Sequence, residues 1–573
     1  MMTYRAPLDD ILFAARLAAG FELKPSGIFA ELGDGLLEAT LNEAAKFAEE
    51  RLASCYRDGD RVGARLNGDA VTTPPGWKEA YADWVKGGWN ALKADPEYGG
   101  LGLPRLLNAA CTEIWQAANP AFAICPLLSQ SAMEALERAA SEELKKGFLT
   151  KMVSGEWGAT MNLTEPQAGS DLALIRAKAE PQTDGSYRLF GQKIFITYGE
   201  HDLTENIVHL VLARLPGAPA GTQGISLFLA PKMLRDDAGR LARRNDLRCA
   251  GIEHKLGIRG CPTCTMVFGD GEGAVAYLVG EPNKGLATMF AMMNDARLAI
   301  GLQGVGVAER ATQQALAYAR ERRQGRSLAG EEPAPILVHP DVKRMALTMT
   351  ALTHAARAIC YETAASIDRA RRESDSVRAR EAQERADLLT PVAKAFSTDI
   401  GNEVASLGVQ IFGGLGYIEE TGAAQVMRDA RIAPIYEGTN GIQAIDLALR
   451  KLQRTGAALA RELEDMRAIA TDARLDGADA LAEAVADFER ASDFMRKAAP
   501  PDLALAGATP YLRLFALARG GTLLAKGASV DDARRAAIAR FFARSLAVAS
   551  SGLAREVIDG GAATLDAEAA LGA

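Results

Sequence analysis

One carboxylate in an apolar segment has the clearest chemical potential in this sequence. Glu437 lies in the run IYEGTNG, from Ile435 to Gly441, and is followed at once by a glycine. Burial disfavours the charged form of a carboxyl group and raises its pKa toward neutrality, so a buried glutamate can remove a weakly acidic proton at cellular pH. The alternative is a loop glutamate that caps a helix beginning near Ile442. Taken alone, this motif favours a helix-capping role for Glu437. The motifs elsewhere in the chain favour its role as a base.

Two further segments carry side chains that suit a planar ligand. The loop MNLTEPQAGSD, 161–171, can offer backbone N–H groups and hydroxyls, or it is a plain β-turn with Asp171 as its cap. The segment GQKIFITYG, 191–199, predicts a strand that ends in a glycine turn, with Phe195 and Thr197 on one face because side chains alternate along a strand. An aromatic ring and a hydroxyl on one face suit a flavin ring. An ordinary half-buried strand is the alternative.

Arginine and glycine motifs in the second half of the chain suit phosphate groups. The run ARLAIGLQGVG, 296–306, is followed by YARERRQGR, 318–326, where clustered arginines at a helix end can bind phosphate through paired hydrogen bonds. The run QIFGGLGY, 410–417, is a Gly-rich turn that lets the backbone approach a pyrophosphate. It is not the dinucleotide-binding GxGxxG, and no βαβ unit surrounds it. Neither glycine run identifies a ligand by itself.

Length and composition limit the class of protein. A chain of 573 residues is long enough for about three or four domains of ordinary size. Hydrophobic residues make up 48% and charged residues 24%, and a net charge of -8 provides no basic field, which argues against nucleic-acid binding. The seven cysteines are scattered and odd in number, which is typical of a reducing cytosol and not of a disulfide scaffold. We therefore expect a cytoplasmic protein.

Neither a metal site nor a membrane segment is expected. Cys261 and Cys264 have redox or zinc spacing, but no second cysteine or histidine pair follows at a finger-like interval. The apolar patch 11–21 is preceded by two aspartates and interrupted by Arg16, unlike a signal peptide. No apolar run approaches the roughly 20 residues that a membrane span needs.

Hydrophobic periodicity divides the chain into helical and β segments. Apolar positions recur at three and four up to residue 155, and short aromatic and β-branched runs between turn residues follow up to residue 280. Helical spacing then returns, with breaks expected at Pro333 to Pro340 and near Pro391, as in a bundle. The expected domains are an N-terminal arm (1–35), a helical domain (36–157), a β domain (158–282), a helical bundle (283–453) and a helical extension (454–573).

Together and in this order, the four motifs resemble the acyl-CoA dehydrogenase family of flavoproteins, from about residue 40 to residue 452. The resemblance implies a mainly α fold with a central β domain: an N-terminal helical domain, a β-barrel middle domain and a C-terminal four-helix bundle, here with an extra C-terminal helical domain. It implies FAD as the cofactor and an acyl-CoA thioester as the substrate. The opening YRAPLDD, the ERRQGR motif and the long extension resemble a long bacterial branch of the family.

The same resemblance assigns roles to individual residues. Glu437 is the implied base, which removes the pro-R α-proton while the β-hydride passes to flavin N5. The thioester carbonyl is implied to bind the backbone N–H of Glu437 and the ribityl 2′-hydroxyl, which stabilises the developing enolate. The implied FAD contacts are Leu163, Thr164, Phe195, Thr197 and Thr439, with Arg322 and Gln324 toward the diphosphate of a neighbouring subunit and Gln410, Gly413 and Gly414 toward its adenosine part. The implied substrate contacts are Ser170, Tyr436, Gly438 and Arg297. For Arg297, a salt bridge on the helix surface is the alternative.

The expected reaction is α,β-dehydrogenation of an acyl-CoA to a trans-2-enoyl-CoA, as in fatty acid β-oxidation, with electrons passed to an electron-transfer flavoprotein. Two alternatives stay open: an acyl-CoA oxidase that uses oxygen, and a non-catalytic acyl-CoA or flavin-binding protein. The intact Glu437 argues against the second. Gln167, where many members have glycine, and Gly325, where an aromatic is usual, depart from the family pattern. The extension is expected to exclude the family's tetramer, so we expect a homodimer.

Overall fold

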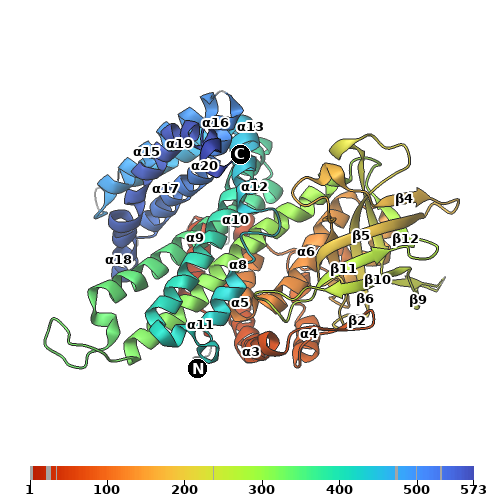
Figure 1. Cartoon of the computed structure of the whole chain (residues 1–573), viewed down its shortest axis with the longest axis horizontal. Helices are drawn as coiled ribbons and strands as arrows, with labels where there is room; N and C mark the ends of the chain where they lie inside the picture. The colour runs from red at the N-terminus through yellow and green to blue at the C-terminus, as the bar shows by residue number, and fades with distance from the viewer. Residues whose placement is uncertain are drawn as a thin grey trace. The chain divides into compact units, whose positions relative to one another are not determined.

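The computed structural model describes residues 4–20, 27–33, 35–236, 238–471, 475–498, 500–528 and 532–572. The chain forms two compact units, each built from segments far apart in the sequence (Figure 1). The helical unit comprises residues 1–46, 104–118 and 297–573, and the β-containing unit comprises residues 47–103 and 119–296.

The strands of the β-containing unit form a sheet that closes on itself. The strand order is β10-β11-β5-β12-β7-β6-β3, and β4 pairs with both β5 and β6, which closes a barrel. β3 is buried along its whole length because α6 and α7 pack against it. These elements are β3 (Trp157–Asn162), β4 (Lys178–Pro181), β5 (Tyr187–Thr197), β6 (Asn206–Arg214), β7 (Ile225–Pro231), β10 (Leu247–Ile252), β11 (Thr263–Phe268), β12 (Ala274–Val279), α6 (Pro120–Ala139) and α7 (Glu142–Val153).

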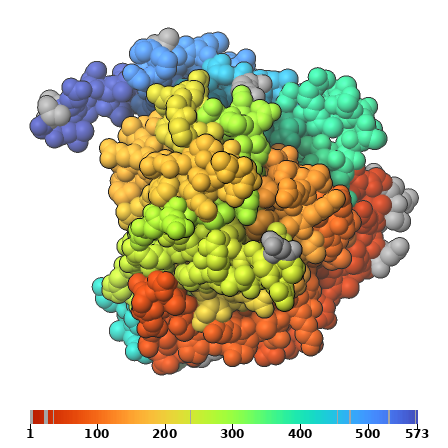
Figure 2. All heavy atoms as spheres, turned by 90° about the vertical axis from the view of Figure 1, so that its right-hand side faces the viewer, coloured from red at the N-terminus to blue at the C-terminus, as the bar shows by residue number. Residues whose placement is uncertain are grey.

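Smaller elements of the same unit lie beside the barrel. Thr73 donates hydrogen bonds from its backbone N–H and its hydroxyl to Asp202 Oδ1, at 3.0 and 2.7 Å, which attaches the β1–β2 hairpin to the loop after β5. Figure 2 shows the segment 47–103, in red to orange, packed along the yellow-green strands. These elements are η2 (Ala48–Leu52), α3 (Ala53–Val62), β1 (Arg65–Asn67), β2 (Ala70–Thr72), α4 (Trp77–Lys86), η3 (Trp89–Ala91), η4 (Pro96–Tyr98), η5 (Leu172–Leu174), η6 (Gly221–Gly224), β8 (Met233–Arg235) and β9 (Leu241–Arg244).

Long helices make the core of the helical unit, in which α9 and α10 pack against each other (Figure 1). The break expected near Pro391 is wrong: Pro391 is buried inside α10, which continues from Ser376 to Phe412. The break expected at Pro333 to Pro340 is present, between α8 and α9. The helices are α2 (Leu36–Phe47), α5 (Arg105–Ala118), α8 (Gly285–Glu321, which starts in the other unit), η7 (Ile336–Val338), α9 (Pro340–Arg372), α10 (Ser376–Phe412), η8 (Gly413–Tyr417), η9 (Glu419–Thr421), α11 (Ala423–Ala430), α12 (Asn440–Ile445) and η10 (Asp446–Lys451).

The C-terminal extension packs on α9 and α10 through a buried charged cluster. Arg385 of α10 pairs with Glu362 of α9 and with Glu462 of α14, and Arg519 of α17 lies 3.2 Å from Glu462. Because α17 also contacts both long helices, the extension shares one core with the bundle. Its helices are α13 (Leu452–Arg454), α14 (Gly456–Ala470), α15 (Ala478–Lys497), α16 (Pro501–Ala506), α17 (Ala508–Ala528), α18 (Ala533–Phe541), η11 (Phe542–Leu546), η12 (Ala547–Ala549), α19 (Ser550–Leu565) and α20 (Glu568–Leu571).

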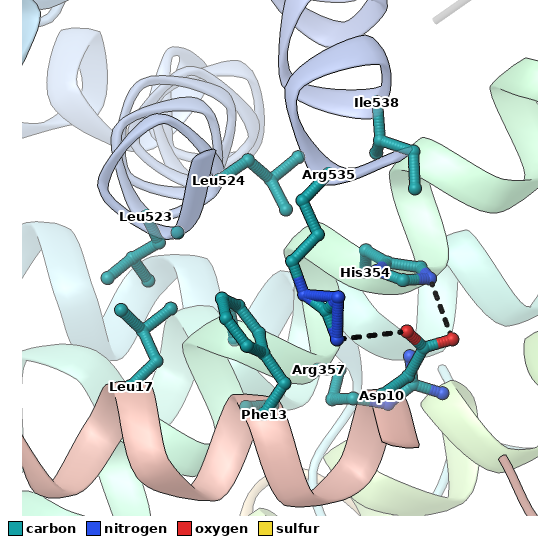
Figure 3. Close-up of a pocket in the computed structure, with 12 residues that line it drawn as sticks. Asp10, Phe13, Leu17, His354, Arg357, Leu523, Leu524, Arg535 and Ile538 are labelled. Atoms are coloured by element: carbon teal, nitrogen blue, oxygen red, sulfur yellow. Dashed lines mark ion pairs between the residues drawn. The ribbon is translucent and has the colours of Figure 1, made fainter. Parts of the chain in front are cut away.

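The described part of the N-terminal arm, α1 (Leu8–Ala19) and η1 (Gly27–Leu32), joins this unit. Figure 3 shows Asp10 of α1 between His354 of α9 and Arg535 of α18, at 3.5 and 3.6 Å. The guanidinium of Arg535 also lies over the ring of Phe13, 3.7 Å from its centroid. The arm thus connects the central bundle with the extension.

No helix among the described residues is long and apolar enough to cross a membrane. Within the same parts of the chain, no group of histidine, cysteine, aspartate and glutamate side chains is arranged to hold a metal ion. Cys261 and Cys264 are buried free cysteines.

Candidate active site

Glu437 occupies a strained turn at the start of α12. Its φ of 56° lies in the left-handed region, which is uncommon for a residue with a side chain, and Gly438 follows with a φ of 84°. The turn is closed by a 2.9 Å hydrogen bond from the Asn440 N–H to the carbonyl of Pro434. Thr439 is the helix cap, since its hydroxyl accepts the N–H of Ile442 at 3.2 Å. The helix therefore does not need Glu437 as a cap, which removes the alternative explanation for this residue.

The electrostatic surroundings of Glu437 adjust its acidity. Burial raises the pKa of the Glu437 carboxyl to about 7, while the positive charges of Arg297 and Lys394 act in the opposite direction. Arg297 is 4% exposed and lies 3.5 Å from Asp446, so it is a buried pair and not a helix-surface salt bridge. A carboxyl group that titrates near neutrality is suited to accept a proton at cellular pH.

The neighbouring Tyr436 is hydrogen-bonded to one of a pair of buried glutamine side chains. Its hydroxyl donates to Gln303 Oε1 on α8, and Gln303 Nε2 donates to Gln116 Oε1 on α5 at 2.8 Å. Gln303 and Gln116 are buried, whereas Tyr436 is half-buried. Tyr436, the residue before Glu437, is therefore tied to α8 directly and to α5 through Gln303.

The second group of predicted site residues lies in the β-containing unit. Phe195 is 59% exposed and has a φ of 59°, at an irregularity in the β5–β11 pairing between Lys193 and Ile196. Thr164 is held beside this strand because its carbonyl accepts the N–H of Ile194 at 3.0 Å. Leu163, Thr164 and Thr197 are half-buried, and Ser170 is exposed.

A buried ion pair lies beneath this group, and the sequence motifs did not single it out. Lys193 Nζ contacts Glu165 Oε1 at 2.7 Å and also donates to the carbonyl of Leu163 at 3.0 Å. The Glu165 carboxylate also accepts the N–H groups of Arg176 and Ala177, at 2.7 and 3.0 Å, and Gln167 Nε2 at 2.6 Å. Both residues lie inside the runs 161–171 and 191–199, where their charges are the sequence signal that could have marked them.

The third group lies where α8 and α10 end. The rings of Tyr318 and Phe412 stack with centroids 4.4 Å apart, which brings the two helix ends together. The predicted residues at these ends are exposed: Arg322, Gln324, Gln410, Gly413 and Gly414. Gly413 has a φ of 62°, which favours glycine, and a Cβ atom added at Gly413 or Gly414 would meet no atom within 4 Å.

Family models of known proteins match most of the chain. They describe the N-terminal domain (residues 37–156), the middle domain (160–270) and the C-terminal domain (283–452) of acyl-CoA dehydrogenases, followed by an acetyl-CoA dehydrogenase C-terminal-like domain (459–568). The chain belongs to the acyl-CoA dehydrogenase family.

One relative supports this assignment, and two solved structures share the fold. The 3-methylmercaptopropionyl-CoA dehydrogenase of Ruegeria pomeroyi is 46% identical over 591 residues, which cover 99% of this chain and 100% of the relative. The crystal structure of Caenorhabditis elegans ACDH-11 in complex with C11-CoA has a TM-score of 0.82 at 20% identity and covers 99% of this chain and 95% of its own. An acyl-CoA dehydrogenase from Bacillus anthracis, complexed with FAD, has a TM-score of 0.73 at 21% identity over 94% of this chain and 90% of its own. The predicted family and fold, including the extra helical domain, are confirmed.

FAD is the cofactor of this family, and the side chains of the β-containing unit fit a flavin. Phe195 presents an apolar ring to solvent from a strand whose backbone is held by its neighbours, and covering such a ring with a flat aromatic ligand is favourable. Thr164 and Thr197 supply hydroxyls nearby in the fold. The protein is thus an oxidoreductase of the acyl-CoA dehydrogenase class.

Proposed function

We propose that Glu437 is the base that removes the α-proton of an acyl-CoA thioester. The observation that carries the proposal is the turn itself: a half-buried glutamate in a strained conformation, with two cations beside it and a pKa of about 7. Strained backbone is retained where the surrounding structure imposes it, and such positions cluster at active sites. The capping role that was the alternative belongs to Thr439.

The reaction follows from the chemistry of the thioester. The α-C–H bond breaks, its proton passes to a carboxylate oxygen of Glu437, and the electron pair forms the new double bond as the β-hydrogen departs. FAD, when bound, would supply the acceptor for that hydrogen as a hydride. The Glu437 N–H is proposed to donate to the thioester carbonyl, because a donor at the developing oxyanion stabilises the enolate. Tyr436, Gly438, Arg297 and Ser170 are proposed to contact the substrate.

The proposal extends to the other predicted contacts and partners. Leu163, Thr164, Phe195, Thr197 and Thr439 are assigned to FAD. Arg322, Gln324, Gln410, Gly413 and Gly414 are exposed in the single chain, as groups that serve the FAD of a second subunit must be. We therefore propose a cytoplasmic homodimer that passes its electrons to an electron-transfer flavoprotein.

The test is anaerobic titration of the purified protein with butyryl-, octanoyl-, palmitoyl- and 3-methylthiopropionyl-CoA while the visible flavin absorbance is followed. Bleaching by one of these thioesters is expected, and the four will rank the acyl groups. Glu437→Gln should keep bound FAD and ligand affinity and lose the bleaching. A Glu437→Gln protein that bleaches at the native rate would contradict the assignment of the base.

The same preparation separates the alternative functions. An oxidase would form hydrogen peroxide in step with enoyl-CoA when oxygen is admitted, whereas a dehydrogenase needs an added electron acceptor. A native protein that binds FAD and acyl-CoA but never bleaches would support the non-catalytic alternative.

A further inference from the structure

Lys394 is a fully buried lysine on α10 whose side chain donates hydrogen bonds to the turn that carries Glu437. Its Nζ donates to the carbonyl of Gly438 at 2.9 Å and to Oδ1 of Asn440 at 2.9 Å. The side chain is 0% exposed. Its neighbours along α10 are buried and mostly apolar: Leu388, Leu389, Val392, Ala393, Ala395 and Phe396. A buried ammonium group is unfavourable unless its hydrogen bonds are made, so this placement needs a reason.

Asn440 completes the attachment of the turn to α10. Its Nδ2 donates to the carbonyl of Ala395 at 3.1 Å, to Oγ1 of Thr398 at 3.0 Å and to Oδ1 of Asp399 at 2.7 Å. Lys394 and Asn440 therefore fix both the carbonyl after Glu437 and the first residue of α12 to one rigid helix. A left-handed residue persists only when its surroundings impose that conformation.

We infer that Lys394 is a positioning residue for the base: its ammonium group holds the Gly438 carbonyl, thereby fixes the left-handed backbone of Glu437, and places a positive charge beside the carboxylate. This inference rests on the proposed function of Glu437 as the base. Lys394 itself is not assigned any contact with the substrate or FAD.

The charged groups around Glu437 come from three elements. Arg297 faces it from α8 and Lys394 from α10, while Asp446 at the start of η10 pairs with Arg297 and Asp399 lies beside Lys394. Burial lowers the pKa of Lys394 to about 7, and burial raises that of Glu437 to about 7, while their mutual attraction opposes both effects. The two groups therefore titrate as a pair, and removing the lysine charge must raise the pKa of the glutamate.

The test is the rate of anaerobic flavin bleaching as a function of pH in the full-length holoenzyme. Lys394→Met keeps the length of the side chain and removes its charge and donors. We expect the maximal rate to fall about 10- to 100-fold because the base is less well placed. We also expect the midpoint of the rising pH limb to move up by about one pH unit, because an opposite charge has been removed. A merely structural lysine would not move the midpoint.

Three variants serve as controls. Lys451→Met removes a half-buried lysine that lies 3.5 Å from Asp387, and it should change neither rate nor midpoint. Lys394→Arg keeps the charge, so the midpoint should stay while the rate falls. Asn440→Ala removes the second acceptor of Lys394 and should likewise lower the rate without moving the midpoint.

The outcomes separate this inference from the proposed function. A native rate and midpoint in Lys394→Met, with an inactive Glu437→Gln, would overturn the role of Lys394 and leave the base in place. An active Glu437→Gln would overturn the base itself. If Lys394→Met fails to fold, the other two variants decide. A native rate in Asn440→Ala or a displaced midpoint in Lys394→Arg overturns the inference. A lower rate with an unchanged midpoint in both variants supports it.

Discussion

Lys193 and Glu165 form an ion pair of 2.7 Å in which the two side chains are 0% and 4% exposed. The pair joins β5, which carries Phe195 and Thr197, to the loop that carries Leu163 and Thr164. Desolvation of the Glu165 carboxyl raises its pKa, but the Lys193 charge and three hydrogen bonds outweigh this effect and leave the pKa below its usual value. Two segments that the sequence analysis assigned separately to a flavin are thus held together by two charged residues that lie within the motifs but were not predicted as site residues.

Breaking this pair should destabilise the protein and loosen the flavin site. For Glu165→Gln or Lys193→Met we expect the free energy of unfolding to fall by about 3 kcal/mol, because one buried charge is left unpaired. The double variant should recover part of this loss. Thermal unfolding and the bound flavin per chain are the measurements.

A matched control lies on the adjacent strand. Lys178 and Glu180 form an exposed pair of 2.7 Å, with side chains 59% and 43% exposed. Exposed pairs contribute about 0–1 kcal/mol, so the corresponding variants should keep both stability and flavin. Equal losses in the two sets would show that burial of the Glu165 pair has no special role.

The sequence predicted the parts of the fold that depend on local pattern. Short alternating strands and long amphipathic helices were recognisable because their periods differ, and the fold class agrees with the relatives. Pro391 was taken for a break because proline removes a helical hydrogen bond, yet packing around it keeps α10 continuous. The domain boundaries and the individual FAD and substrate contacts stay predictions.

Sequence patterns did not predict which side chains from distant segments contact the site residues. Glu437 was singled out by its own motif, but Lys394 lies 43 residues earlier in a helix where nothing but its charge among apolar neighbours marks it. Arg297 was predicted as a site residue, and only the structure distinguished a buried pair with Asp446 from a surface salt bridge. Such side chains are recognised by what they contact, which spacing along the chain does not encode.

Removing the hydroxyl of Tyr436 should disturb the residue next to the base. In Tyr436→Phe the Oε1 of Gln303 loses its donor in a buried setting, which costs about 1–3 kcal/mol. We expect a lower thermal midpoint and a slower bleaching rate with acyl-CoA. Tyr417→Phe is the control, since Tyr417 is 86% exposed and should tolerate the change. Indistinguishable behaviour of the two variants would exclude a role for the hydroxyl.

The extension should be inseparable from the bundle. Arg519 is 1% exposed, and Arg519→Met would leave Glu462 and Glu362 with Arg385 as their remaining cation in this cluster. We expect a loss of about 3–5 kcal/mol in the free energy of unfolding. Arg544→Met, which removes an exposed pairing with Asp479 in the same extension, should cost little. Separate unfolding transitions for the extension and the bundle would contradict a shared core.

The arm contact in Figure 3 predicts a loss of stability in mild acid. Burial lowers the pKa of His354 to about 4, whereas an unfolded histidine titrates near 6.5. Between these values the unfolded chain binds a proton that the folded chain does not, so stability is complete above about pH 6.5 and falls as the pH approaches 4. At pH 5 this one group should reduce the free energy of unfolding by about 2 kcal/mol.

His354→Gln should therefore show a smaller drop in thermal midpoint between pH 7.5 and pH 5 than the native protein. His254→Gln, at an exposed position, should show the native drop. An unchanged pH dependence in His354→Gln would mean that acid acts on the protein through other groups.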